Sequence, residues 1–204
     1  MKNKKRRPIV LADRDGTLIR DVPYLSRLEE ITLLPGVAEA LRQLNRRQIP
    51  VAMVTNQSGV ARGYFPESFV LESHARLMEL LAGEDAAIQG LYYCPHLSPE
   101  DSHPVSEASL ARYRKACSCR KPEPELVFRA LYDLGGDPDR SAVIGDADRD
   151  ILAGFSAGVK LGYRIVGREA GSSTVPSPFQ VSSFAEGVER FLTWLDGGDA
   201  PRGF

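Results

Sequence analysis

Two aspartates separated by a single residue are the first feature of this sequence that could do chemistry. Asp13 and Asp15 follow the short apolar run 9–12, which predicts a buried strand, and a Gly-Thr pair comes directly after them. Charged groups at the end of a buried strand are costly to desolvate unless a cation or a reaction requires them there. The pair therefore predicts a reactive or cation-binding site, and a plain surface turn is the alternative.

Polar residues also follow two later apolar runs. Thr55 comes after the run 51–54, and Asp146 comes after the run 141–144. Ligand sites in open α/β sheets lie at the carboxyl ends of the strands. We therefore expect both residues at the same sheet edge as Asp13.

This edge of the predicted sheet has the groups that an anion and a hard cation would need. Thr55 and the amides after it can donate hydrogen bonds to an anion, and Asp146 can complete an oxygen-ligand cation site with Asp13. Lys121, just before a helix expected to begin at Pro122, adds a positive charge. Each residue alone could be part of a turn or a cap, but together they favour a functional site.

The elements that must position these residues alternate along the chain. Short runs rich in Val and Ile alternate with segments of helical periodicity, which is typical of βα units around a mostly parallel sheet. The expected fold class is therefore α/β, a Rossmann-like three-layer sandwich. The expected strands lie at 9–12, 51–54, 88–93, 141–144, 159–166 and Val181, and the expected helices lie at 36–48, 66–83, 122–134, 148–157 and 184–195.

Length and composition indicate one ordinary globular domain over residues 1–204. The chain is 43% hydrophobic and 26% charged, which excludes a disordered chain, and it has no run of 18 apolar residues that would span a membrane. Basic residues concentrate in the leader 1–7, so the rest is mildly acidic and argues against a nucleic-acid surface. The leader and the tail 197–204 are expected to be frayed. Too few apolar residues follow the leader for a signal peptide, which predicts a cytoplasmic protein.

Three cysteines and one histidine form two short arms in the irregular segment 94–121. The arms are Cys94-x-His96 and Cys117-x-Cys119. Four such donors fill a tetrahedral zinc site with no open position, so we expect a structural zinc that staples this segment, with unligated thiols as the alternative. An odd number of cysteines without an export signal argues against a disulfide framework.

The other two histidines have no such arrangement. His74 lies on a predicted helix and His103 lies inside the segment 94–121. Both are expected to be solvated side chains.

Four motifs resemble, in the same order, those of the haloacid dehalogenase superfamily of phosphatases. They are DRDGT at 13–17, TNQSG at 55–59, RKP at 120–122 and GD at 145–146. The resemblance extends over about residues 8–168. Longer stretches at 55–63, 92–96 and 117–122 are similar to the heptose-bisphosphate phosphatases, and the histidinol-phosphate phosphatases are the nearest relative group.

The resemblance implies a two-step mechanism. Asp13 is the expected nucleophile, which forms an aspartyl-phosphate, and Asp15 is the expected acid and base. Thr55 and Lys121 are expected to hold the phosphoryl oxygens. A Mg²⁺ ion is expected on Asp13, the main-chain carbonyl of Asp15 and Asp146, because a dianionic phosphate must approach a carboxylate.

Substrate recognition is expected from the segment after the first motif and from the second and third motifs. The resemblance assigns it to Asp21, Tyr24, Asn56, Gln57, Ser58 and Arg120. An arginine such as Arg120 can bind a second phosphate with two hydrogen bonds. Ala147 is a departure, since the heptose phosphatases have a lysine there, and it bears on the choice of sugar phosphate.

The implied activity is hydrolysis of a phosphate monoester, most closely the 7-phosphate of a heptose 1,7-bisphosphate made for lipopolysaccharide. Histidinol phosphate or another small sugar phosphate is the alternative substrate. The intervals between the motifs hold no globular insert, so we expect a capless, monomeric enzyme. A dinucleotide-binding module is disfavoured because no G-x-G-x-x-G follows a predicted strand. A zinc-stabilised phosphate-binding protein remains the non-enzyme alternative.

Overall fold

A six-stranded parallel sheet forms the centre of the computed structural model, which describes residues 6–101, 108–167 and 179–199. The strand order is β3-β2-β1-β4-β5-β6, and every neighbouring pair is parallel. The strands are β1 (Val10–Ala12), β2 (Val51–Asn56), β3 (Gly90–Cys94), β4 (Ala142–Gly145), β5 (Leu161–Ile165) and β6 (Gln180–Val181). The expected α/β class is confirmed.

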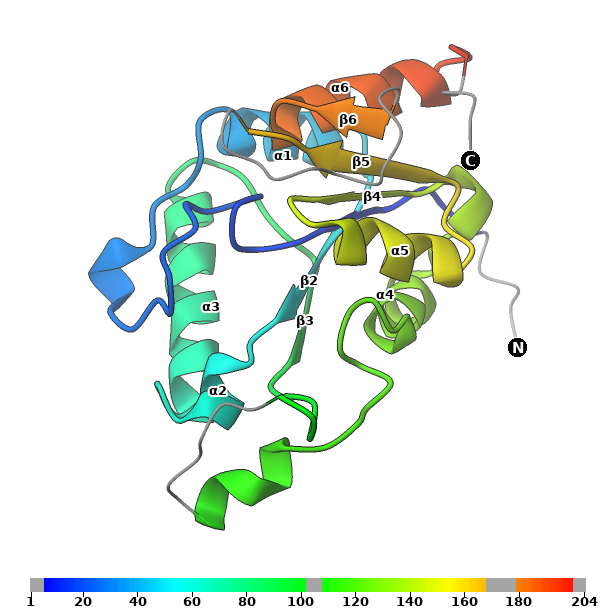
Figure 1. The fold of residues 1–204 in the computed structure, drawn as a ribbon. Helices are drawn as coiled ribbons and strands as arrows, with labels where there is room; N and C mark the ends of the chain where they lie inside the picture. The colour runs from blue at the N-terminus through cyan, green and yellow to red at the C-terminus, as the bar shows by residue number, and fades with distance from the viewer. Residues whose placement is uncertain (1–5, 102–107, 168–178, 200–204) are drawn as a thin grey trace.

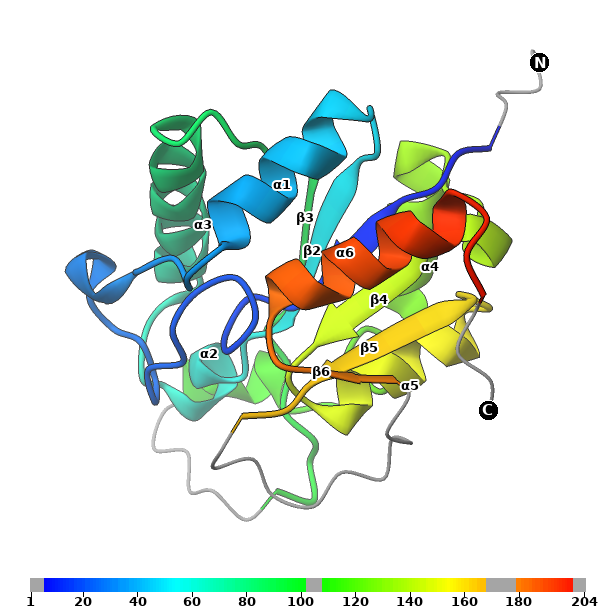
Figure 2. The ribbon, with the colours of Figure 1, turned by 90° about the horizontal axis from the view of Figure 1, so that it is seen from above.

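Helices cover both faces of the sheet and make three layers (Figures 1 and 2). The helices α1 (Val37–Arg46), α3 (Glu67–Ala82) and α6 (Phe184–Leu195) pack on one face. The helices α4 (Glu125–Leu134) and α5 (Asp148–Ser156) pack on the other. The remaining elements are the short helix α2 (Gly59–Arg62) and the 3-10 turns η1 (Leu28–Glu30), η2 (Ala108–Tyr113) and η3 (Pro138–Arg140).

The central strand shows why the apolar runs predict this sheet. Val10 and Ala12 pack toward the face of α1 and α6, whereas Leu11 packs toward the face of α4 and α5. Successive strand residues point to opposite faces, and both faces here are covered by helices. All three side chains are buried, so β1 is continuously apolar up to Asp13.

The segment between β1 and α1 is an extended flap, residues 18–35. It contains η1 and two isolated bridges, one between Asp15 and Ile19 and one between Ile19 and Leu33. Figure 1 shows it projecting beside α3. Its size agrees with the expected flap rather than with a globular cap.

The ends of the chain differ from the expected fraying. The backbone NH of Arg7 donates to the carbonyl of Gly135 at 3.0 Å, and the NH of Asp137 donates to the carbonyl of Arg7 at 2.8 Å. The NH groups of Gly197 and Gly198 donate to carbonyls at the end of α6. Backbone pairing, which needs no apolar side chain, thus holds these residues at the two ends of the described chain. The rest of the leader and tail, 1–5 and 200–204, lies outside the described residues.

Two element predictions were incomplete. The strand β2 continues through the polar pair Thr55 and Asn56 because their backbones pair with Tyr93 and Cys94 of β3. Helix α2 has only four residues, too few for a periodic pattern, and ends at Gly63, whose φ is +75°.

In the part of the chain that the structure describes, no helix is both long and apolar enough to cross a membrane.

Candidate active site

The candidate site lies where the strand order reverses. β1 is flanked by β2 on one side and by β4 on the other, so the chain changes direction across the sheet at β1. Such a point leaves a crevice at the carboxyl ends of the strands. Asp13, Thr55 and Asp146 follow or end these strands, and Lys121 reaches the same place from the segment before α4. The structure therefore brings together the residues that the motifs predict.

Three carboxylates form a cluster at this edge. Oxygens of Asp13, Asp146 and Asp150 all lie within 4.8 Å of one another. Asp150, a residue that the sequence analysis placed only within a helix, is buried in the first turn of α5 and accepts a hydrogen bond from the NH of Ala147 at 2.9 Å. Its position four residues after Asp146, in a helix that begins where β4 ends, is the signal that could have identified it.

Glycines allow the carboxylates to approach the backbone. Gly16 has a φ of +70°, and a Cβ there would lie 2.2 Å from Oδ2 of Asp146. A Cβ on Gly145 would lie 2.4 Å from the side chain of Asp150. Both glycines are thus required by close contacts, and the first also by its left-handed conformation.

Lys121 is a buried ammonium held between carboxylates. Its Nζ donates to Oδ1 of Asp13 at 2.8 Å and to the carbonyl of Val54 at 2.6 Å, and it lies 2.8 Å from Oδ1 of Asp150. Burial by itself lowers the pKa of Lys121, but the Asp13 and Asp150 carboxylates outweigh it and raise that pKa above its ordinary value. Lys121 is therefore a fixed positive charge beside Asp13.

Asn56 positions Lys121 through the main chain. Its side-chain NH₂ donates to the carbonyl of Lys121 at 3.0 Å, and its side-chain oxygen accepts from the NH of Lys121 at 3.0 Å. This amide, predicted to contact substrate, is engaged with the protein backbone. The two reciprocal bonds fix the end of β2 against the third motif.

Asp15 belongs to a separate network. The Nε of Arg14 donates to both carboxylate oxygens at 3.1 and 3.2 Å, and Nε2 of Gln57 donates to Oδ2 at 3.0 Å and to Oγ1 of Thr55 at 3.0 Å. Arg14 also donates to Gln57 and to Ser73. Burial raises the pKa of Asp15, although the guanidinium of Arg14 opposes this effect. A carboxyl group with a raised pKa can both give and take a proton.

The carboxylate cluster has the chemistry of a cation site. Oδ1 of Asp146 is buried and has no hydrogen-bond partner among the described residues. Burial and the neighbouring charges of Asp13 and Asp150 raise the pKa of Asp146 to about 7. Three carboxylates with one ammonium leave excess negative charge, and oxygen donors of this kind suit Mg²⁺. The residues present therefore fit a divalent cation.

A hollow of about 180 Å³ opens beside Asp15. Five of the six residues predicted to recognise substrate line it, namely Asp21, Tyr24, Asn56, Gln57 and Ser58, and the others include Arg14, Phe65 and Arg149. Arg120 lies outside this lining, with Nη1 donating to the carbonyl of His96 at 3.2 Å. The flap and the segment after β2 thus form the walls of one pocket.

Two exposed tyrosines join these walls. The rings of Tyr24 in the flap and Tyr64 after α2 have centroids 4.1 Å apart at 56°. Tyr24 also has a φ of +53°, which is uncommon for a residue with a side chain. The contact holds the flap against the segment that follows β2.

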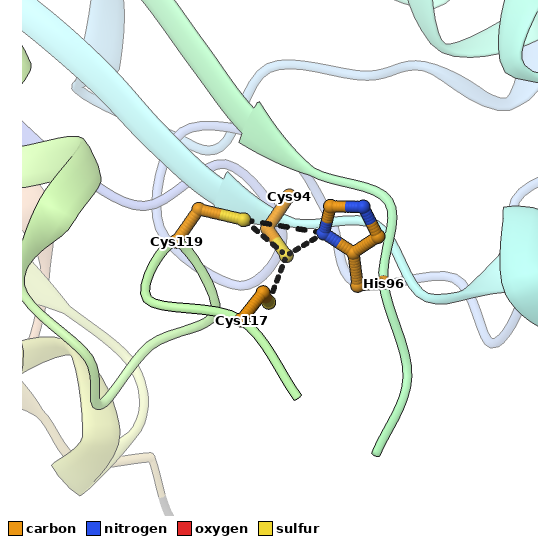
Figure 3. Close-up of side chains that lie close together, drawn as sticks. All are labelled: Cys94, His96, Cys117 and Cys119. Atoms are coloured by element: carbon orange, nitrogen blue, oxygen red, sulfur yellow. Dashed lines mark hydrogen bonds between the residues drawn. The ribbon is translucent and has the colours of Figure 1, made fainter. Parts of the chain in front are cut away.

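The cysteine and histidine side chains converge as the spacing predicts (Figure 3). The Sγ of Cys94 lies 3.6 Å from that of Cys117 and 3.2 Å from that of Cys119, and Nδ1 of His96 lies 3.2 Å from Sγ of Cys119. A disulfide needs about 2.05 Å between sulfurs, so these are free thiols. Tetrahedral zinc with bonds of about 2.0–2.3 Å places its ligands about 3.3–3.8 Å apart, close to these distances.

Other contacts besides this cluster also hold the described residues of the segment 94–121, among them the ion pair of Arg62 with Asp101 and the hydrogen bond of the Tyr113 hydroxyl to Glu67. Leu97 and Tyr113 pack with Val60 and Val70, and Leu97 exchanges backbone hydrogen bonds with Tyr113 and Lys115. The 3-10 turn η2 lies within this segment. A hollow of about 710 Å³, lined by His96, Cys117 and Cys119 among others, gives solvent access to the cluster.

The prediction that His74 is solvated was wrong. His74 is buried in α3, and its ring packs edge-on against Tyr93 with centroids 5.6 Å apart. Burial, assisted by the charge of Arg14, lowers its pKa to about 3. The polar neighbours of His74 in the sequence concealed that it faces the sheet. His103 lies outside the described residues.

Comparison with known proteins identifies relatives over most of the chain. A family model described as haloacid dehalogenase-like hydrolase matches residues 24–158. The D-glycero-D-manno-heptose-1,7-bisphosphate 7-phosphatase of Thermosynechococcus vestitus is 35% identical over 202 residues, which cover 96% of this chain and 99% of that protein. The D-glycero-beta-D-manno-heptose-1,7-bisphosphate 7-phosphatase of Haemophilus influenzae is 37% identical over 152 residues, with 74% and 78% covered.

A solved structure shows the same fold. The D,D-heptose 1,7-bisphosphate phosphatase of B. bronchiseptica, crystallised with magnesium and phosphate, superposes with a TM-score of 0.76. It is 25% identical, and the match covers 92% of this chain and 99% of that one. On the extent of these matches, the chain belongs to the haloacid dehalogenase-like hydrolases.

Proposed function

We propose that this protein is a magnesium-dependent phosphomonoesterase that removes the 7-phosphate of D-glycero-D-manno-heptose 1,7-bisphosphate. The observation that carries the proposal is the buried Asp13 carboxylate, held 2.8 Å from the Lys121 ammonium and beside two further carboxylates. The relatives named as heptose-bisphosphate phosphatases support the substrate.

The first chemical step forms a covalent bond to Asp13. Lys121 occupies Oδ1 of Asp13, which leaves Oδ2 to attack phosphorus. The P–O bond to the sugar breaks, and Asp15 gives its proton to the departing oxygen. Thr55 accepts a hydrogen bond from Gln57, so its own hydroxyl proton is available to a phosphoryl oxygen.

The second step restores the enzyme. Asp15, now ionised, takes a proton from water, whose oxygen forms a new bond to phosphorus. The bond between phosphorus and Asp13 breaks, and inorganic phosphate leaves. Water and phosphate monoester are thereby converted into alcohol and phosphate. The raised pKa of Asp15 suits both proton transfers because the acid form must be present at the start.

The residues that would hold Mg²⁺ are Asp13, Asp146 and Asp150, with the main-chain carbonyl of Asp15. When bound, the ion supplies positive charge that lets a dianionic phosphate approach an ionised carboxylate. The buried, unpartnered Oδ1 of Asp146 supports this assignment. Asp150 joins the set expected from the sequence.

Zinc is proposed for the second cluster. Cys94, His96, Cys117 and Cys119 supply four donors at distances that fit a tetrahedral ion. Because four protein ligands leave no position for substrate, the proposed ion is structural. It would hold Arg120 and Lys121, which directly follow Cys119, in place.

A substrate panel tests the proposed activity. The purified protein is assayed with Mg²⁺ on both anomers of heptose 1,7-bisphosphate, on heptose 7-phosphate and on histidinol phosphate. We expect kcat/KM to be highest on a heptose bisphosphate. A higher kcat/KM on histidinol phosphate would make histidinol phosphate the substrate instead. No phosphate release from any of the four compounds would favour a phosphate-binding protein.

A further inference from the structure

Arg149 is a basic residue of the candidate pocket that the proposed mechanism does not use. It lies in the first turn of α5 and lines the 180 Å³ hollow together with Asp15, Ser58 and Tyr24. Its side chain is exposed and makes no hydrogen bond or ion pair with any other described residue. A guanidinium that is part of a pocket wall without a protein partner is free to bind a ligand.

Two other arginines lie near it. Arg120 is half-buried before α4, and Arg62 ends α2. Burial lowers the pKa of Arg120, and the charges of Arg149 and Arg62 lower it further. Three guanidiniums from three separate segments are thus near enough for their charges to interact, and Arg149 is the one of the three that lines the hollow.

The other arginines near the pocket form ion pairs with carboxylates, whereas Arg120 and Arg149 do not. Arg62 binds Asp101 through both guanidinium nitrogens at 3.3 and 2.8 Å, Arg14 pairs with Asp15, and Arg164 pairs with Asp148 at 3.0 Å. Arg120 donates to the neutral carbonyl of His96, and Arg149 makes no hydrogen bond or ion pair with the described residues, although its charge acts on the nearby carboxylates of Asp146 and Asp150.

The carboxylates near the pocket do not remove this excess. Lys121 and a divalent cation would balance Asp13, Asp146 and Asp150. Because Asp15 is paired with Arg14, Asp21 in the flap is the remaining acidic residue of the lining. Holding like charges together is unfavourable unless an anion occupies the space between them. A phosphate group carries the charge and the oxygen geometry that two guanidiniums match.

We propose that Arg149 binds the non-reacting phosphate of a bisphosphorylated substrate, beside Arg120, for which the resemblance already implies such a contact, and that Arg149 thereby determines the preference for bisphosphates over monophosphates. This inference rests on the proposed function, because it requires that the reacting phosphate lies at Asp13. It adds a specificity residue to that site. No bond is made or broken by Arg149.

Kinetics on a matched pair of substrates test the inference. For Arg149→Ala, kcat/KM on heptose 1,7-bisphosphate is expected to fall about 10- to 100-fold, the range for one charge-assisted hydrogen bond, mainly through KM. On heptose 7-phosphate the loss is expected to stay within about threefold. For Arg149→Lys, kcat/KM on the bisphosphate should lie between the values of the wild type and Arg149→Ala, since lysine keeps the charge without the bidentate geometry.

Two controls make the outcome decisive. Arg140→Ala removes an exposed arginine on η3, at the opposite end of β4, and corrects for the change in net charge. Binding of heptose 1,7-bisphosphate to Asp13→Asn, with and without Arg149→Ala, measures affinity without turnover. Equal losses on both substrates, or an unchanged Kd in the double variant, would overturn the role of Arg149.

The same design separates this inference from the proposed function. Fructose 1,6-bisphosphate and fructose 6-phosphate are assayed in parallel. If the protein prefers the fructose bisphosphate and Arg149→Ala removes that preference, the heptose substrate is wrong but the role of Arg149 stands. If the heptose bisphosphate is preferred and Arg149→Ala weakens both members of each pair equally, the function stands and the role of Arg149 is rejected.

Discussion

Two clusters of potential metal ligands lie on either side of Arg120 and Lys121, and they are built in different ways. In the carboxylate cluster, Asp13 and Asp146 directly follow β1 and β4, and Asp150 lies in the first turn of α5, the helix that comes after β4. The thiol cluster joins Cys94 and His96, at the end of β3, to Cys117 and Cys119 in a long irregular segment. A single residue, Arg120, separates Cys119 from Lys121 in the chain.

The two clusters therefore differ in what holds them in place. The strands that carry the carboxylates are buried on both faces, so core packing positions them whether or not an ion is bound. The described part of the segment 94–121 instead packs through a small apolar cluster, in which Leu97 and Tyr113 contact Val60 and Val70. Removal of the first ion should therefore affect chemistry, whereas removal of the second should affect structure.

The largest expected effect is on turnover, from Asp13→Asn. The change is nearly isosteric, so the fold should persist, but an amide neither attacks phosphorus nor balances Lys121. We expect kcat to fall more than about a thousandfold with little change in circular dichroism. Asp139→Asn, at an exposed position on η3, is the control. Retention of a tenth of the wild-type rate would show that Asp13 is not the nucleophile.

The second prediction concerns the thiol cluster, where the first loss should be of structure. Replacing Cys117 and Cys119 together by Ser should abolish bound zinc, which we expect at about one ion per wild-type chain. The melting temperature should fall by about 5 °C or more, and protease should cut within 94–121. Activity should drop on every substrate without rescue by Mg²⁺, because Arg120 and Lys121 lose their support.

The neighbouring change Ser118→Ala controls for substitution in this turn, since Ser118 is not a predicted ligand. Elemental analysis and limited proteolysis give the readouts. A zinc-free wild-type protein with an intact segment and full turnover would show that the four side chains form no metal site.

The parts that the sequence predicted well depend on local patterns. Helix α6 has the expected bounds because Ser183 caps it, accepting a hydrogen bond from the NH of Glu186, and because its apolar residues form one stripe. The buried strands were visible because both faces are apolar. The motif residues at their ends followed from the parallel topology.

The parts that it missed depend on partners far apart in the chain. Asp150 is a cluster member only because α5 turns it toward Lys121, which arrives from another segment. The wall formed by Arg149 and Tyr24 exists only once the flap lies beside α5 and α2. No periodicity in the sequence encodes either contact.

The third prediction concerns Asp150→Asn, which leaves Lys121 with one carboxylate partner and removes one charge from the cluster. The concentration of Mg²⁺ needed for half-maximal rate should rise about 10- to 100-fold, the range for loss of a supporting residue at a metal. Zinc content should stay unchanged, which would confirm that the two clusters are independent. Asp148→Asn, two residues away and paired with Arg164, is the matched control. An unchanged Mg²⁺ requirement would exclude Asp150 from the cation site.

The smallest expected effect comes from His74, which is linked to both regions through its neighbours. Its neighbour Ser73 binds Arg14 of the active site, and its ring packs on Tyr93, which precedes Cys94 in β3. Burial and Arg14 lower the pKa of His74 from 6.5 to about 3, so the folded protein keeps the ring neutral where the unfolded chain binds a proton. The stability that this provides is fully present above pH 6.5 and is lost as the pH falls toward 3. Between pH 7.5 and 5.5 the free energy of unfolding should therefore fall by about 1.3 kcal/mol on account of His74. Urea unfolding of wild type and His74→Leu at both pH values, with zinc and Mg²⁺ present, measures it. The variant should lack this part of the decrease whatever its overall stability, and equal decreases in the two proteins would show that His74 is protonated in the fold.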